Sequence, residues 1–252
     1  MAGWTVVDEG VLEAPSSWTV EDYELVQSSN IRTVNSPLDP GTFAWTLDSS
    51  WTDYYVKARV MSEDNDWIGV MFRYVDANNY YRFSMREEFI DRHWRLVKVE
   101  SGAATILDEK SGEDNGYTSG NNYEVEIRAN GSSLEVYLDR EKILEATDST
   151  FVSGGIALYS WANAGSYFDN VIVARMDNDC DGDSTPDVND PDDDADGYGD
   201  YIEAIMGTDP LDAASKPDTI YINFGPKWSE RPVLWGPQGT EDYDTDRGYG
   251  WQ

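Results

Sequence analysis

Acidic side chains crowd one short stretch of the chain, from Asp177 to Asp212. This stretch contains fourteen of the 49 acidic residues and no lysine or arginine. Carboxylates this close together repel one another, so the segment must either stay solvated and loose or surround a cation. Calcium prefers hard oxygen ligands. A twelve-residue loop supplies them from positions 1, 3, 5, 7, 9 and 12 when a glycine at position 6 allows a sharp turn.

One window of twelve residues fits every position of such a loop. It is DDDADGYGDYIE, in which Gly197 stands at position 6. A glutamate at the last position can bind calcium with both oxygens, and the pattern of the residues around it predicts a short helix. The sequence therefore predicts a calcium site in this second loop (residues 192–203), with oxygen ligands from Asp192, Asp194, Asp196, the Tyr198 carbonyl, Asp200 and Glu203.

The preceding window, DCDGDSTPDVND, fits with two departures. Ser184 stands where the glycine is expected, and a left-handed turn at a residue with a Cβ costs about 1–2 kcal/mol. The last position holds an aspartate, which is shorter than glutamate. We expect this first loop (residues 179–190) to bind calcium more weakly, through Asp179, Asp181, Asp183, the Thr185 carbonyl, Asp187 and Asp190. The alternative for both loops is an acidic, solvated linker whose aspartates fall on loop positions by crowding.

The two loops, followed by GTDPLDAASKP, resemble thrombospondin type 3 repeats of secreted bacterial proteins. The resemblance covers about residues 177–217. It implies two or more calcium ions, an extracellular location, and a connector between modules that calcium stiffens.

A second set of residues suits a sugar ligand. An aromatic ring packs on the apolar face of a pyranose, and charged or amide groups bond its hydroxyls. Nine residues in loops and near strand ends have this character: Asp66, Trp67, Tyr80, Arg82, Arg92, His93, Trp94, Trp161 and Asn163. An exposed cluster of Trp67, Trp94 and Trp161 would favour binding. The alternative is that these side chains close the ends of a hydrophobic core.

Catalysis is not predicted for this chain. A retaining glycoside hydrolase needs two carboxylates about 5–5.5 Å apart. The nearest candidates, Glu124 and Glu126, lie two residues apart on one strand. Their alternation with apolar residues favours a solvated strand face over a catalytic pair. A polysaccharide lyase would need a base and a neutralising cation from Arg92, His93 and Arg95, but the chain has a single histidine. A jelly-roll glycoside hydrolase or polysaccharide lyase remains the less favoured alternative.

The elements that must position these residues are strands. Apolar and polar residues alternate in YYVKARVM, YEVEIRA and SSLEVYLD, and Asn130-Gly131 between the last two predicts a hairpin. WIGVMFRYV is apolar on both faces, which is typical of a strand in the middle of a sheet. Roughly a dozen such strands predict an all-β, antiparallel β-sandwich of the jelly-roll type.

Two stretches, WIGVMFRYVDANNYYRF and GGIALYSWANAGSYFDNVIV, resemble the laminin G/concanavalin-like jelly rolls of secreted carbohydrate-active proteins. The resemblance covers about residues 4–175. It implies a curved two-sheet sandwich that often binds glycans without catalysis. It also implies a structural calcium where the first and last strands meet, for which the candidates are Asp169 and either Asp8 or Glu9. A strand-end aspartate that caps a turn is the alternative.

Composition divides the chain into three parts. We expect a glycan-binding sandwich (residues 1–176), a calcium-binding connector (177–217) and the start of a further, truncated β-module (218–252). The net charge of −31 argues against nucleic acid and anionic membranes as partners. No apolar run is long enough for membrane insertion. The single cysteine, Cys180, allows no disulfide within the chain.

We therefore expect a carbohydrate-binding accessory module with a calcium-stabilised connector, from a larger secreted bacterial protein that degrades polysaccharide. Its partners would be a polysaccharide or oligosaccharide and the neighbouring modules of the same chain. The alternative is a purely structural, calcium-dependent spacer of an adhesin or enzyme.

Overall fold

The computed structural model describes residues 3–21, 23–33, 39, 41–46, 51–88, 91–177, 180–183 and 185–216. The chain divides into two units, Met1–Met176 and Asp177–Gln252, and each is described by itself. The further β-module expected over residues 218–252 lies outside the described residues.

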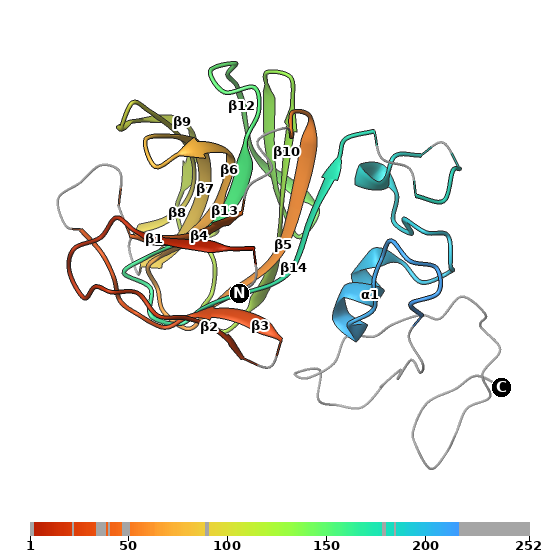
Figure 1. Cartoon of the computed structure of the whole chain (residues 1–252), viewed down its shortest axis with the longest axis horizontal. Coiled ribbons are helices and arrows are strands. Elements are labelled where there is room, and N and C mark those ends of the chain that lie inside the picture. The colour runs from red at the N-terminus through yellow and green to blue at the C-terminus, as the bar shows by residue number, and fades with distance from the viewer. Residues whose placement is uncertain are drawn as a thin grey trace, which may run out of the picture. The chain divides into compact units, whose positions relative to one another are not determined.

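The first unit is a sandwich of two seven-stranded antiparallel sheets, as Figure 1 shows, and the predicted fold class is confirmed. The first sheet has the order β1 (Thr5–Asp8), β4 (Thr42–Thr46), β13 (Gly155–Trp161), β6 (Trp67–Asp76), β7 (Asn79–Glu88), β8 (Asp91–Glu100) and β9 (Ala103–Ser111). The second sheet has the order β12 (Glu141–Thr147), β11 (Ser133–Leu138), β10 (Asn122–Asn130), β5 (Tyr54–Ser62), β14 (Ser166–Arg175), β3 (Glu24–Gln27) and β2 (Trp18–Glu21).

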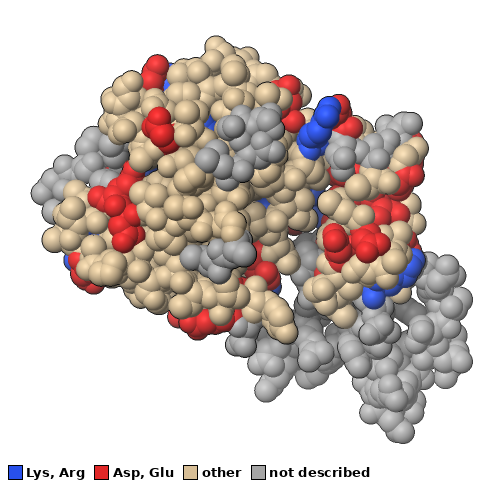
Figure 2. Space-filling view, viewed as in Figure 1, with Lys and Arg blue, Asp and Glu red and all other residues tan. Residues whose placement is uncertain are grey.

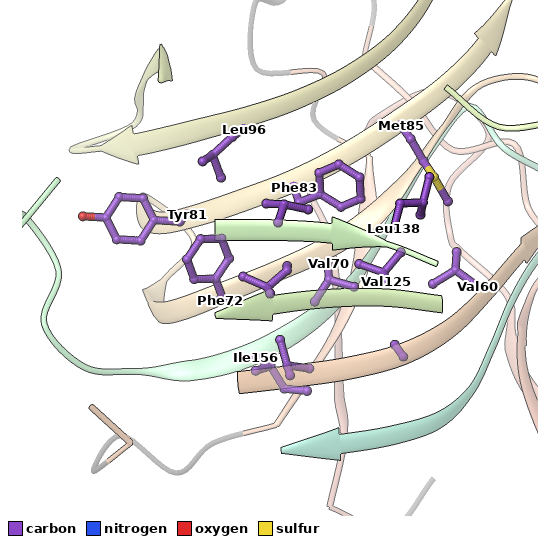
Figure 3. Close-up of a cluster of buried hydrophobic side chains, with 14 of the residues drawn as sticks. Val60, Val70, Phe72, Tyr81, Phe83, Met85, Leu96, Val125, Leu138 and Ile156 are labelled. Carbon is purple, nitrogen blue, oxygen red and sulfur yellow. The ribbon is translucent and has the colours of Figure 1, made fainter. Parts of the chain in front are cut away.

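The main core lies between the two sheets. Val56 and Val60 of β5 are buried, while Lys57 between them is half-buried, as the alternation predicts. In Figure 3 the side chains of the two sheets, among them Phe83 and Val125, point toward one another. Burying each large apolar side chain contributes about 1.5–3 kcal/mol, so this core fixes which face of every strand is turned inward.

The first sheet is apolar on its other face as well. Strand β6 lies between β13 and β7, and its residues from Trp67 to Tyr74 are buried on both faces. A second cluster covers this outer face and includes Phe43, Met71, Tyr80 and Val97. We call this side of the first sheet the outer face. A mid-sheet position for β6 is what its continuous apolar run predicts.

The second unit has little regular structure in its described part. A single turn of 3-10 helix covers Asp187–Asn189, and helix α1 covers Asp200–Met206. Helix α1 ends at Gly207 in the left-handed conformation, with φ of 75°. This is the short helix expected around Glu203, and it begins three residues before the end of the second loop. In the described residues, no helix has the length and apolar character that a membrane crossing requires.

Candidate functional site

The outer face carries one continuous row of residues across five strands. Tyr159 of β13 pairs with Gly69 of β6, Gly69 with Ser84 of β7, Ser84 with Arg95 of β8, and Arg95 with Glu109 of β9. Residues two positions away along a strand share its face. The row is therefore flanked by further outer-face side chains, which include Trp161, Trp67, Arg86, His93, Met71 and Arg82.

Guanidinium groups lie over aromatic rings on this face. The Arg82 guanidinium carbon is 4.2 Å from the ring centroid of Tyr159, and that of Arg95 is 4.5 Å from the ring of Trp67. Arg86 approaches the same indole at 5.2 Å. Such contacts hold a guanidinium flat against the ring while its edge remains directed at hydrogen-bond acceptors.

Acceptors alternate with these donors. Arg95 donates from Nε to Glu109 at 2.6 Å, and the Nη1 atom of Arg95 lies 3.5 Å from an oxygen of Asp39. His93 lies 3.1 Å from the same glutamate, and the Tyr159 hydroxyl donates to the Asp39 carbonyl at 2.6 Å. Alternating donors and carboxylates suit a ligand with several hydroxyl groups, because each hydroxyl both donates and accepts.

Two buried donors on the outer face have no hydrogen-bond partner in the described part of the chain. They are the indole Nε1 of Trp67 and the hydroxyl of Ser84, whose residues are 2% and 1% exposed. A buried polar group without a partner costs roughly 1–3 kcal/mol. Such groups identify places where a ligand or water supplies the missing acceptor.

Glu9 lies beyond the end of β1, where its backbone donates to the Gly41 carbonyl at 2.9 Å. Burial raises the pKa of its carboxyl to about 7, although the positive charge of nearby Arg82 lowers it. The Glu9 carboxyl in turn contributes to the raised pKa of Tyr74 and Tyr80, both of which reach about 12 mainly through burial. The outer face therefore includes a carboxyl that titrates near neutral pH.

The structure brings five of the nine predicted sugar-site residues to the outer face. These are Trp67, Tyr80, Arg82, His93 and Trp161. A sixth, Asp66, precedes β6 and is half-buried. Burial and the charge of Asp64 raise the pKa of Asp66 to about 6.

The remaining three residues lie elsewhere. Trp67, Trp94 and Trp161 therefore do not form the exposed cluster that would favour binding, and Trp67 itself is buried. Trp94 points to the opposite side of the sheet, packs against the main core and donates from Nε1 to the Gly116 carbonyl at 2.8 Å. The other two have structural contacts. Arg92 holds the carbonyls of Asn115 and Tyr117, and buried Asn163 donates to the Asp66 carbonyl and the Tyr117 hydroxyl.

Sequence reasoning missed Tyr159, Ser84 and Glu109. The first two lie two residues from Trp161 and Arg82, which were recognised, so the period of the strands could have identified them. Glu109 carried no such signal, because its place depends on the pairing of β8 with β9.

The carboxylates considered for other roles are engaged with their own neighbours. Glu126 is buried and bonded to Arg128, and burial raises the pKa of Glu124. Asp8 accepts hydrogen bonds from the Ser16 backbone and the Thr42 hydroxyl, as a turn-capping aspartate does. Asp169 forms an ion pair with Arg59 at 2.8 Å.

The two acidic loops share one hydrogen-bond pattern, offset by thirteen residues. The side chain at position 3 accepts from the backbone of position 5, at Asp181 and again at Asp194. Position 5 accepts from position 7, at Asp183 and again at Asp196. Position 9 accepts from position 2, at Asp187 and again at Asp200. The loops are therefore structural repeats as well as repeats in sequence.

In the second loop, Asp192, Asp194 and Asp196 each accept a backbone hydrogen bond with one carboxylate oxygen. Asp192 accepts from Gly197 with Oδ2, while its buried Oδ1 has no hydrogen-bond partner among the described residues. The same holds for the Oδ2 atoms of Asp194 and Asp196. Carboxylate oxygens of these three residues lie within 4.8 Å of one another. Oxygens so close and so poorly solvated repel one another unless a cation lies between them.

Glu203 of α1 adds a fourth carboxylate. Its side chain is 0% exposed, and neither of its oxygens has a hydrogen-bond partner in the described chain. Burial, together with the charges of Asp194, Asp196 and Asp200, raises the pKa of Glu203 to about 7. The donor set of hard oxygens, with buried and unpartnered carboxylates, fits a calcium ion.

The first loop is described in part, because Asp179 and Ser184 lie outside the described residues. Carboxylate oxygens of Asp181, Asp183 and Asp190 lie within 4.8 Å of one another. Gly182 adopts φ of 78° at position 4, as Ala195 does with φ of 52° at position 4 of the second loop.

Comparison with known proteins places the sandwich among similar domains. No curated protein matches the chain. The carbohydrate-binding module CBM66 from Bacillus subtilis superposes with a TM-score of 0.55 at 22% identity, over 69% of this chain and 96% of that one. A functionally unknown protein from Saccharomyces cerevisiae gives 0.50 at 10% identity, over 69% and 97%. These likenesses show the fold.

The structural likenesses do not assign the chain to a family, but a family model does. The model that matches residues 1–174 is described as a 3-keto-alpha-glucoside-1,2-lyase-like domain. The match spans the sandwich up to the end of its last strand and covers more than half of the chain. This chain belongs to the 3-keto-alpha-glucoside-1,2-lyase-like domain family.

Proposed function

We propose that the sandwich is a non-catalytic glycan-binding module and that the outer face of its first sheet holds the sugar. The observation that carries the proposal is the combination of ring-stacked guanidiniums, carboxylates and two buried unpartnered donors on that face. Half-buried Trp161 supplies aromatic surface next to the buried rings of Trp67 and Tyr159. Arg95 and Glu109 supply donors and acceptors for hydroxyls. The carbohydrate-binding module with the same fold supports this function by analogy.

A matched pair of tryptophan variants tests the proposed face. Trp161 and Trp94 are both half-buried, and each donates its indole N–H to a backbone carbonyl, of Thr33 and Gly116 respectively. Only Trp161 lies on the outer face. A polysaccharide array identifies the ligand, and calorimetry then compares Trp161→Phe with Trp94→Phe. We expect the first variant to lose affinity about tenfold while the second binds like the wild type. Equal affinity in both variants would place the sugar elsewhere.

The proposal that the sandwich lacks catalytic activity needs a separate test, because the matching family model is described as a lyase-like domain. The chain is incubated with 3-keto-glucosides and with the polysaccharides that it binds. We expect no unsaturated product and no new reducing ends. Turnover that Glu9→Gln abolishes would make the outer face an active site, with Glu9 as the first candidate for proton transfer.

We propose further that the second unit is a calcium-stabilised connector of a secreted, polysaccharide-degrading protein. The support is the set of buried, unpartnered oxygens from Asp192, Asp194, Asp196 and Glu203 in the second loop. The Tyr198 carbonyl and Asp200 complete the ligand set that the loop register predicts. A bound calcium would neutralise two of the negative charges that these residues bring together. The first loop, with the same hydrogen-bond pattern, is the second site.

Calorimetric titration of the chelator-treated chain tests the connector. We expect two sites, with dissociation constants around 10⁻⁴–10⁻³ M or tighter. Glu203→Gln should abolish or strongly weaken one of them, because the amide cannot supply a second charged oxygen. Asp212→Asn in the same unit is the control and should leave both sites intact. A titration without calcium heat would leave the acidic linker as the better description.

A further inference from the structure

Lys216 is the first basic residue after Arg175 and follows fourteen acidic ones. Its ammonium group reaches back twenty positions to the second loop. There the Lys216 Nζ atom donates to the Asp196 carbonyl at 3.1 Å and lies 3.7 Å from Oδ2 of the Asp196 side chain.

The oxygen that Lys216 approaches is one of those proposed to bind calcium. The Asp196 side chain is 0% exposed, its Oδ1 accepts from the Tyr198 backbone, and its Oδ2 has no hydrogen-bond partner in the described chain. Lys216 therefore acts directly on a buried carboxylate of this loop.

The segment that carries Lys216 is folded back locally. The Asp209 backbone donates to the Ser215 hydroxyl at 2.9 Å, and the Ser215 backbone donates to the Asp212 carbonyl at 2.7 Å. These turns hold the ammonium group close to the loop, so its effective concentration there is high even though its side chain is 49% exposed.

We infer that Lys216 is a tethered competitor for the cation in the second loop. This inference rests on the proposed calcium function. With calcium absent, the ammonium offsets part of the repulsion among the loop carboxylates. A calcium ion that binds the Asp196 Oδ2 atom repels the Lys216 ammonium group. Binding of the ion and the close approach of Lys216 are therefore mutually exclusive at this oxygen. Lys216 thus sets the calcium affinity of this loop below what its ligand set alone would give.

A charge-removing substitution at Lys216 tests the inference with calcium as the probe. Lys216→Gln keeps a donor for the Asp196 carbonyl but removes the charge. We expect it to tighten calcium binding roughly three- to tenfold at low salt, and the gain to shrink as potassium chloride is added. Lys142→Gln is the control, because Lys142 is similarly exposed and pairs with glutamates of the sandwich. It should leave the affinity unchanged.

A second readout follows Lys216 itself. Limited acetylation with mass-spectrometric detection should show that saturating calcium speeds modification of Lys216 and leaves Lys142 unaffected. If Glu203→Gln weakens binding while Lys216→Gln changes neither affinity nor salt dependence, the inference about Lys216 is wrong and the calcium site stands. Unchanged Lys216 reactivity in saturating calcium also overturns it. A wild-type chain that binds no calcium overturns both.

Discussion

Single residues carry most of the functional information in this chain, because burial changes what an ordinary side chain does. Glu9 and Glu203 are both glutamates with a pKa raised to about 7 by burial, yet their surroundings differ. Burial favours the protonated form of Glu9 and outweighs the charge of nearby Arg82, which favours the ionised form. Glu203 has other carboxylates as neighbours, so a cation stabilises it better than a proton does.

The raised pKa of Glu9 predicts how the stability of the sandwich depends on pH. The folded form keeps a proton up to about pH 7, whereas the unfolded form releases it near the ordinary pKa of 4.5. The folded form therefore binds more protons in this window, and stability falls as pH rises through it. Glu9→Gln should flatten the fall and be more stable than the wild type above pH 7. Urea unfolding at several pH values measures this, with exposed Glu141→Gln as the control. Parallel wild-type and Glu9→Gln profiles would contradict it.

Individual strands and loops show how far the sequence determines these positions. Alternation identified the inward residues of β5 and β11 and the hairpin at Asn130-Gly131, because in these strands only one face meets the core. Alternation does not separate the two faces of β8, where Trp94 and Leu96 face the main core while Val97 faces the outer cluster. Both faces of the first sheet are covered, so apolar residues occur at odd and at even positions along its strands. The sequence of apolar and polar residues therefore does not distinguish one face from the other.

The acidic loops were predictable for a different reason. The positions that we propose as calcium ligands follow from spacing alone, since each loop is local in sequence and its backbone turns are fixed by side chains two to seven residues away. The outer-face site depends instead on register between strands far apart in the chain, such as Tyr159 beside Gly69. The spacing of residues within the sequence does not determine this register between strands.

Loop geometry leads to a prediction at the level of the second loop. Gly197 has φ of 94° and donates its N–H to Asp192, whereas Ala195 is held at φ of 52°. A Cβ in the left-handed region costs about 1–2 kcal/mol, so Gly197→Ala should weaken calcium binding about tenfold. Ala195→Gly relieves the same kind of strain and should leave affinity equal or higher. Calorimetry measures the calcium affinity of both variants. Equal losses of affinity would show that the backbone conformation at these two positions does not determine how tightly the loop binds calcium.

At the scale of the whole chain, the two units are built on opposite principles. The sandwich encloses a large apolar core between its sheets, and burial of this core stabilises it. The described part of the second unit has the buried apolar Val188, and its other buried side chains include Asp187, Asp193 and Glu203. In Figure 2 acidic side chains spread over the visible face and basic ones are few, so little positive charge from the protein is available to offset them.

This contrast predicts that calcium orders one unit and leaves the other unchanged. Without an ion, the carboxylates of the second loop repel one another, and helix α1 has no basic residue in its last turn and no side-chain cap at its start. A cation held by Asp192, Asp194 and Glu203 ties the loop to that helix and removes the repulsion.

Hydrogen exchange followed by mass spectrometry should therefore show calcium-dependent protection over residues 192–206. The strands of the sandwich should exchange at the same rates with calcium and with chelator. Loss of protection in both units on chelation would mean that the sandwich also holds an ion, and equal exchange of α1 under both conditions would mean that its fold owes nothing to calcium.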